Sequence, residues 1–219
     1  IAVFQSLANN DPDVDAIFRM TRQLPITFQL EETIRAVPDG TYSPWNSQAV
    51  VVRDVAFWGL FLPISVTGRV SDIWRSYITS RMLFATPYFV AFTSPFVIQY
   101  RNPHDYQIDL VDEQDLYLKT NEMVRTISEF SIRDSAPFHA NLIRLIDSLK
   151  QKKIIGAVDA LLARSWVFDL HSLNYSWPTM TSDFPPFTPP RGPVFDFRRF
   201  SLNAIDNRAD TVLLPSLDK

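Results

Sequence analysis

The sequence contains no cysteine and only five glycines among its 219 residues. Without cysteine the chain cannot form disulfides, a thiolate metal site or a cysteine nucleophile. The few glycines form neither a Walker pattern nor a G-x-G-x-x-G pattern, so a glycine-rich phosphate loop is not expected within this chain. These absences exclude several common enzyme classes, but they do not fix the cellular compartment.

Long apolar runs and basic tracts are also missing. The longest apolar run, AFWGLFLPI at residues 56–64, is shorter than the roughly 20 residues that a membrane helix needs. There is no signal-peptide pattern, and the chain starts with Ile1 in an apolar segment. We therefore expect a segment of a longer protein, with any membrane anchor outside it. The net charge of −3 and the lack of a basic stripe argue against nucleic-acid binding.

The residues that are present favour a folded domain of the mixed α/β class. Hydrophobic residues make up 46% of the chain, enough for a sizeable core. Up to about Tyr106, short apolar runs that predict strands alternate with segments that predict helices. The expected strands lie at residues 1–4, 49–52, 88–92 and 96–100, with Thr93-Ser94-Pro95 separating the last two.

The second part of the chain has helical periodicity and then becomes rich in proline. An amphipathic helix is predicted over residues 109–130, and two apolar stripes predict two more helices. From Trp177 onward, prolines exclude regular helix and central strand, and interleaved phenylalanines predict an extended arm packed on a surface. We expect three parts: residues 1–107, a helical extension over 108–176, and a proline-rich aromatic arm over 177–219. The stripes are Leu142, Leu145, Ile146 and Leu149, and Val158, Leu161, Leu162, Ser165 and Trp166.

An acid at the start of a predicted helix is the first candidate for chemistry. In GRVSDIWRSY, Ser71 is expected as the N-cap with Asp72 in the first turn, flanked by Arg69 and Arg75. Asp72 is either an acid stabilised by the helix dipole or a general base that takes a proton from an acceptor hydroxyl. The arginines either bind a phosphate or sugar acid, or hold Asp72 in an ion pair. Trp74 either offers its face to a sugar ring or belongs to the core.

Two further patterns are typical of metal ligands. Asp13 and Asp15 form an Asp-Val-Asp triplet, which suits Mg²⁺ or Mn²⁺ beside a nucleotide diphosphate but also occurs in capped turns. His104 follows an apolar run, where a neutral imidazole can bind a metal or simply be a solvated loop residue. His139 and His171 lie in helical patterns and are expected to be structural. No histidine pair has zinc spacing, and no G-x-S-x-G motif is present.

Three stretches together resemble the STELLO-type glycosyltransferases, which in plants are Golgi proteins associated with cellulose synthase assembly. They are QSLANNDPDVDAIFRMTR, PDGTYSPWNSQAVVVRDVAFWGLFLPISVTGRVSDIWRSYITSRMLF and FVIQYRNPHDYQIDLVDEQDLY, and the likeness covers roughly residues 1–120. A fainter likeness is to the reversibly glycosylated polypeptides, which act as UDP-arabinopyranose mutases. Its positions are Pro12, Asp13, Asp15 and Ala16, then Gly40 and Thr41, then Asp72, Ile73 and Trp74.

The resemblance implies a GT-A-like fold, of which this chain would hold the acceptor-side half, with the nucleotide-binding half upstream. It implies a nucleotide sugar, a UDP-sugar above all, bound with Mn²⁺ or Mg²⁺, and a glycan or protein acceptor. Asp72 would be the catalytic base, and His104 would complete a metal site whose acid cluster lies upstream of the Asp13 and Asp15 triplet. The implied substrate-binding residues are Asp13, Asp15, Trp45, Asn46, Arg69, Trp74 and Arg75.

The resemblance also implies a location and an alternative function. The location is the lumenal side of the Golgi, in a single-pass membrane protein whose anchor lies outside this segment. In the alternative, the GT-A fold is a catalytically inactive scaffold that binds and assembles a membrane glycosyltransferase partner. The acidic segment 109–130 and the proline-rich arm would then form the contact surface.

Overall fold

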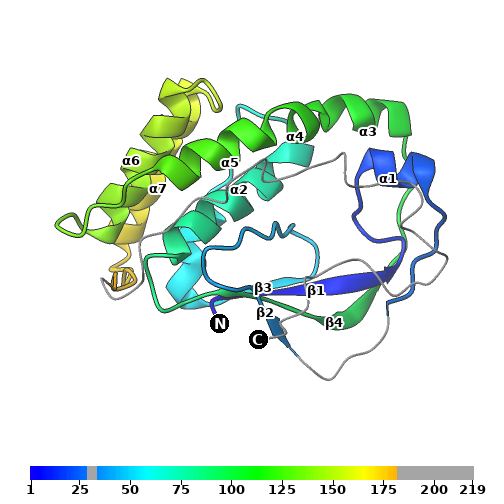
Figure 1. Ribbon diagram of the computed structural model, residues 1–219, viewed down its shortest axis with the longest axis horizontal. Helices are drawn as coiled ribbons and strands as arrows, with labels where there is room; N and C mark the ends of the chain where they lie inside the picture. The colour runs from blue at the N-terminus through cyan, green and yellow to red at the C-terminus, as the bar shows by residue number, and fades with distance from the viewer. Residues whose placement is uncertain (29–33, 182–219) are drawn as a thin grey trace.

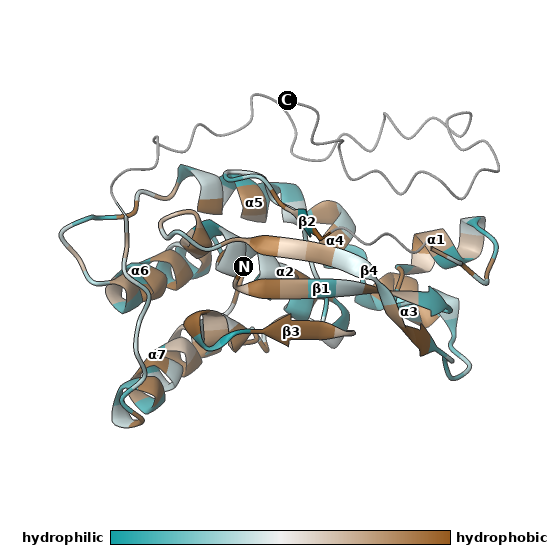
Figure 2. Ribbon diagram, turned by 90° about the horizontal axis from the view of Figure 1, so that it is seen from below, coloured by the Kyte–Doolittle hydropathy of each residue, from teal (hydrophilic) through white to brown (hydrophobic). Residues whose placement is uncertain are grey.

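The computed structural model describes residues 1–28 and 34–181, and it confirms the mixed α/β class. A four-stranded mixed sheet lies along one side of the molecule, and helices α2 to α7 lie on the other side of it (Figure 1). The strand order is β2-β4-β1-β3, in which β1 and β4 are parallel and the outer pairs are antiparallel (Figure 2). The strands are β1 (Val3–Asn10), β2 (Arg35–Ala36), β3 (Val50–Val52) and β4 (Val90–Gln99).

Strand β4 is one continuous strand, so the prediction of two strands separated by Thr93-Ser94-Pro95 is wrong. Proline lacks the N–H that a regular ladder needs, which favours an interruption in the sequence pattern. The register between β1 and β4 shifts between Ser6 and Ala8, opposite this proline. The hydroxyl of Ser6 accepts a hydrogen bond from the backbone N–H of Phe96 at 3.3 Å. The irregularity thus carries the strand past Pro95.

Helix α2 (Gly68–Leu83) forms the centre of the core, and 12 of its 16 residues are buried. It begins at Gly68 with Thr67 as the N-cap, so the prediction that Ser71 caps it is wrong. The hydroxyl of Ser71 instead donates to the carbonyl of Pro63 at 2.6 Å, in the segment that leads into the helix. Asp72 therefore lies beyond the first turn, where stabilisation by the helix dipole is weak.

The predicted helix at 109–130 is three shorter helices in the structure. The apolar positions Met123, Val124 and Ile127 are buried as expected. The first break is at Glu113, whose side chain turns inward to accept a hydrogen bond from the backbone of Ala16, and the second is at Lys119, between α4 and α5. The helical elements are α1 (Ala16–Thr21), the 3₁₀ helix η1 (Asp54–Leu60), α3 (Tyr106–Asp112), α4 (Gln114–Leu118), α5 (Thr120–Glu129), α6 (Phe138–Gln151) and α7 (Ala157–Ser172).

The two C-terminal helices differ in how well their stripes predict burial. All four stripe residues of α6 are buried, which confirms that prediction. In α7 the predicted stripe is wrong, because Val158, Leu161 and Leu162 are 37 to 66% exposed. The buried side of α7 carries Asp159, Ala160, Ala163, Val167 and Leu170 instead. The two alanines let the first half of α7 lie close to its neighbours, and Asp159 fixes this side by its hydrogen bonds to Ile64 and Ser65.

The predicted parts of the chain share one core. The buried cluster includes Val3, Trp74 and Val90 from the first part together with Leu145 and Leu170 from the helical extension. The division at residues 107 and 108 therefore stays a prediction about chain organisation. Most of the predicted arm, residues 182–219, lies outside the described residues. No helix within residues 1–28 and 34–181 is long and apolar enough to cross a membrane.

Candidate functional site

Five of the predicted site residues line one cavity of about 380 Å³. They come from three parts of the sequence: the loop before α1, the loop before β3, and the first two turns of α2. Glu113, together with residues of helices α4 and α5, forms the opposite wall. The five residues are Asp13, Asp15, Asn46, Arg69 and Asp72, and the other lining residues are Val14, Pro44, Gly68, Ile73, Tyr77, Glu113, Leu116, Tyr117, Thr120 and Asn121.

Asp72 faces the cavity from α2 with one carboxylate oxygen held in place. Its Oδ2 accepts a hydrogen bond from the backbone N–H of Ser47 at 2.8 Å. Among the described residues, Asp72 has no partner in an ion pair within 4 Å. A carboxylate that is oriented by the backbone and not neutralised by a contacting cation can accept a proton from a bound hydroxyl.

Arg75 lies behind Asp72, outside the cavity. Its guanidinium is buried, lies over the Trp45 ring at 4.4 Å from the ring centroid, and donates to the hydroxyl of Ser47 at 3.3 Å. Burial lowers the pKa of Arg75, and the nearby charge of Asp72 opposes that shift. Of the two roles predicted for Arg75, only the orientation of Asp72 matches this position.

The two tryptophans predicted to line a sugar cleft are core residues, so that prediction is wrong. Trp74 is fully buried, and its indole N–H donates to the hydroxyl of Thr120 at 3.0 Å. Trp45 is buried beneath Arg75. Large aromatic rings, on α2 for Trp74 and in the loop before β3 for Trp45, gain more free energy by burial in the core than by facing an open cavity. Through Thr120, which does line the cavity, Trp74 supports the wall from behind.

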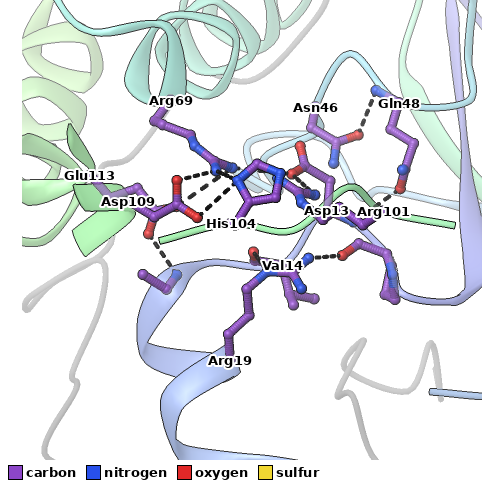
Figure 3. A network of polar contacts seen from close by, with 12 residues as sticks. Asp13, Val14, Arg19, Asn46, Gln48, Arg69, Arg101, His104, Asp109 and Glu113 are labelled. Carbon is purple, nitrogen blue, oxygen red and sulfur yellow. Dashed lines mark hydrogen bonds and ion pairs between the residues drawn. The ribbon is translucent and has the colours of Figure 1, made fainter. Parts of the chain in front are cut away.

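Arg69 is the centre of a network of polar contacts (Figure 3). Its Nη2 donates to Oδ1 of Asp109 and lies 3.1 Å from Nδ1 of His104. Its Nη1 lies 3.6 Å from Oδ1 of Asp13 and 4.0 Å from Oε1 of Glu113. The guanidinium thus has three carboxylates within 4 Å.

Asp109 and His104 form the outer side of this network. Burial alone would raise the pKa of Asp109, but the hydrogen bond and charge of Arg69, together with His104, outweigh burial and lower it. Nδ1 of His104 lies 3.3 Å from Oδ2 of Asp109. Only the tautomer protonated at Nδ1 leaves Nε2 free for a metal ion.

The described residues do not by themselves form a metal centre. Within residues 1–28 and 34–181 no three His, Asp or Glu side chains are grouped closely enough to hold a metal ion. Asp13 is engaged by Arg101 at 2.6 Å, and Asp15 caps α1 by accepting from the backbone N–H of Phe18 at 3.0 Å. The helix-capping interpretation of the acid triplet therefore holds for Asp15 but not for Asp13.

Glu113 and Tyr117 belong to the site but were not predicted from the sequence. Oε2 of Glu113 accepts from the backbone N–H of Ala16 at 2.7 Å and from the hydroxyl of Tyr117 at 2.5 Å. The same hydroxyl lies 3.3 Å from Oδ1 of Asp15. Burial, followed by the bond to Glu113, raises the pKa of Tyr117. The only sequence signal is their four-residue spacing in a helical segment, which is too common to single them out.

Two kinds of comparison with known proteins indicate the same family. The family model described as STELLO glycosyltransferases matches residues 69–191, more than half of the chain. Two Arabidopsis thaliana proteins, named "Probable glycosyltransferase STELLO2" and "Probable glycosyltransferase STELLO1", are each 27% identical to the chain over 183 residues. The match covers 81% of this chain and 24% and 23% of those proteins, so the chain spans about a quarter of their length. The resemblance stated from the sequence is thereby confirmed.

Proposed function

We propose that this chain, which belongs to the STELLO glycosyltransferase family, forms the acceptor side of a glycosyl-transfer site in which Asp72 is the general base. The observation that carries the proposal is the position of Asp72. Its carboxylate is oriented by the Ser47 N–H and opens on a cavity of about 380 Å³, a size that suits one sugar unit of an acceptor.

The reaction proposed is transfer of a sugar from a nucleotide sugar to an acceptor hydroxyl. Asp72 takes the proton of the hydroxyl as its oxygen forms a bond to the anomeric carbon of the donor. The bond from that carbon to the nucleotide diphosphate breaks, and the diphosphate leaves with the electron pair. Arg75, held on Trp45 and bonded to Ser47, keeps Asp72 in position.

The donor side is proposed to lie mainly in sequence outside this chain. The match covers only 24% and 23% of the relatives' length, and a GT-A-like arrangement in which a second half binds the nucleotide is consistent with that difference. Mn²⁺ or Mg²⁺ is part of the proposal, and His104 would be one of its ligands. Because the described residues do not complete a metal centre, no step here depends on the ion. Action in the Golgi lumen on a glycan or protein acceptor is proposed from the family alone.

The test uses the natural full-length protein that contains this sequence. Transfer from UDP-sugars to a panel of glycan acceptors is measured for the wild type and for Asp72→Asn. A general base contributes about two to four orders of magnitude, so Asp72→Asn should slow transfer by that factor while acceptor binding is retained. The control is Asp134→Asn, which changes an exposed acid in the loop between α5 and α6. Transfer by folded Asp72→Asn at the wild-type rate would refute the role of Asp72. A folded wild type that transfers no sugar would favour the scaffold function instead.

A further inference from the structure

We infer that the acceptor bound in this cavity is an uncharged or cationic polyol, and that acceptors carrying a carboxylate or phosphate at the bound sugar are rejected. The inference rests on the proposed function and goes further, because it names the chemical class of the acceptor. It also reverses the prediction that Arg69 and Arg75 receive a diphosphate or a sugar acid in this place.

The first argument is the charge of the cavity wall. The lining side chains include four carboxylates and a single guanidinium. Three of the carboxylates lie on one wall: Asp13 and Asp15 in the loop before α1, and Asp72 on α2. Glu113, between α3 and α4, lies on the opposite wall. An anionic group entering this space meets like charges on both walls, and repulsion between like charges over a few ångströms is substantial even in water.

The second argument is that the single guanidinium on the wall, Arg69, is already neutralised. It is hydrogen-bonded to Asp109, and Asp13 and Glu113 lie within 4 Å of it. Asp109 is buried, so this partner stays with Arg69 rather than turning to solvent. To receive a phosphate or carboxylate, Arg69 would have to leave Asp109, and this buried carboxylate would then lose its arginine partner.

The other nearby cations do not reach the cavity. Arg101 is bonded to Asp13 at 2.6 Å, and Arg75 is buried over Trp45. Neither arginine is among the residues that line the cavity. The Nε atoms of both arginines are buried in the protein and have no hydrogen-bond partner among the described residues, so these N–H groups are not presented to a ligand in the cavity.

The wall suits a neutral sugar. Carboxylates accept hydrogen bonds from hydroxyl groups, and the sugar's C–H surface can contact the apolar side chains of Ile73 and Leu116. Asn46 is oriented by the backbone N–H of Gln48, which donates to its amide oxygen at 3.1 Å. Thr120 and Asn121 add neutral polar groups to the same wall.

The test is a charge scan at one position of a small probe. Three glycosides differ only at carbon 6: methyl glucopyranoside, its uronic acid, and its 6-amino-6-deoxy derivative. Binding to the natural full-length protein is measured by saturation-transfer NMR at pH 7 and low salt. The neutral and amino probes should bind, and the uronic acid should bind at least roughly fivefold more weakly, the repulsion expected from one carboxylate about 4 Å away under bulk-water screening. Equal or tighter binding of the uronic acid overturns the inference, as does failure of all three probes to bind.

A variant tests whether the weaker binding of the uronic acid is caused by the charge of the cavity wall or by the shape of the cavity. Asp13→Asn removes one wall carboxylate and releases Arg101 and part of Arg69, so the discrimination against the uronic acid should shrink. Asp134→Asn changes an exposed acid that does not line the cavity, and it should leave the discrimination unchanged. The two proposals fail separately. If Asp72→Asn transfers sugar normally and the wild-type protein still binds the uronic acid more weakly than the neutral probe, only the role of Asp72 as general base is refuted. If Asp72→Asn is inactive but the wild-type protein does not discriminate against the uronic acid, only the inferred acceptor class is refuted.

Discussion

Asp159 provides the sharpest stability prediction in the molecule. The residue lies in the first turn of α7 and its side chain is fully buried. Its Oδ1 accepts from the backbone N–H groups of Ile64 at 2.7 Å and Ser65 at 3.2 Å. Its Oδ2 accepts from the Ser65 hydroxyl and from the N–H of Gly156 at 3.1 Å. One carboxylate therefore satisfies three backbone donors and fastens the segment before α2 to the start of α7.

Replacing Asp159 by Ala leaves the N–H groups of Ile64 and Ser65 without this acceptor, whereas the N–H of Gly156 keeps the Ser65 hydroxyl at 2.7 Å. Each donor that loses its partner costs up to about 1–3 kcal/mol. Water can reach Ile64 and Ser65, which are exposed residues, so we expect the free energy of unfolding to fall by about 2–4 kcal/mol. Asp159→Asn keeps one acceptor oxygen but directs an NH₂ group at the remaining donors, and about 1–3 kcal/mol is expected.

The assay is equilibrium urea unfolding, followed by tryptophan fluorescence and far-ultraviolet circular dichroism. Asp169→Ala changes an exposed acid on the same helix and is the matched control, expected within about 0.5 kcal/mol of wild type. If the free energy of unfolding falls by less than about 1 kcal/mol in Asp159→Ala, at an unchanged m-value, the Asp159 carboxylate does not stabilise the fold through these hydrogen bonds.

Two further predictions concern pH and packing. Burial, and then the charge of His171, lower the pKa of His139 below its ordinary 6.5; the unfolded chain therefore binds the proton first, and stability should fall as pH drops through 6.5 and level off below the folded pKa. The urea midpoint at pH 7.5 and 5.5 should differ less in His139→Phe than in wild type, and an equal difference contradicts the assignment. A Cβ on Gly59 would lie 2.7 Å from Thr79, so Gly59→Ala should destabilise by about 1–3 kcal/mol. Thermal unfolding checks this, and Thr79→Ala should recover part of the loss; a neutral Gly59→Ala would show that the contact yields easily.

Local pattern predicted the elements where packing follows local amphipathicity. The stripe of α6 is buried because α6 has one apolar side and one core to face. In α7 the same reasoning fails, because the exposed and buried sides both carry leucine, and the hydrogen bonds of Asp159 select the side of Leu170 rather than that of Leu161. Periodicity reports which residues share a side of a helix, and only the tertiary partner decides which side is buried.

The site shows the same division between local and non-local information. Five polar residues that were predicted from the sequence as site candidates do line one cavity: Asp13, Asp15, Asn46, Arg69 and Asp72. The tryptophans failed because a ring in a helix gives no local sign of whether it faces the core or a ligand. Glu113 and Tyr117 were missed because their partners, Ala16 and Asp15, lie about a hundred residues away in sequence.

The position of β1 in the sheet has a consequence for the order of folding. The first strand of the segment is an inner strand, paired with β3 on one side and with β4 on the other, and Val3 lies opposite Val90. The pairing of β1 with β4 brings together residues that are more than 80 positions apart in the sequence. Contacts of such long range form slowly, so the chain should fold more slowly than one with mainly local contacts. During synthesis, β1 leaves the ribosome before either partner; β3 follows first and can pair with one edge, whereas the other edge stays unpaired until β4 follows. Deleting these few residues would split the sheet through its middle rather than trim its edge.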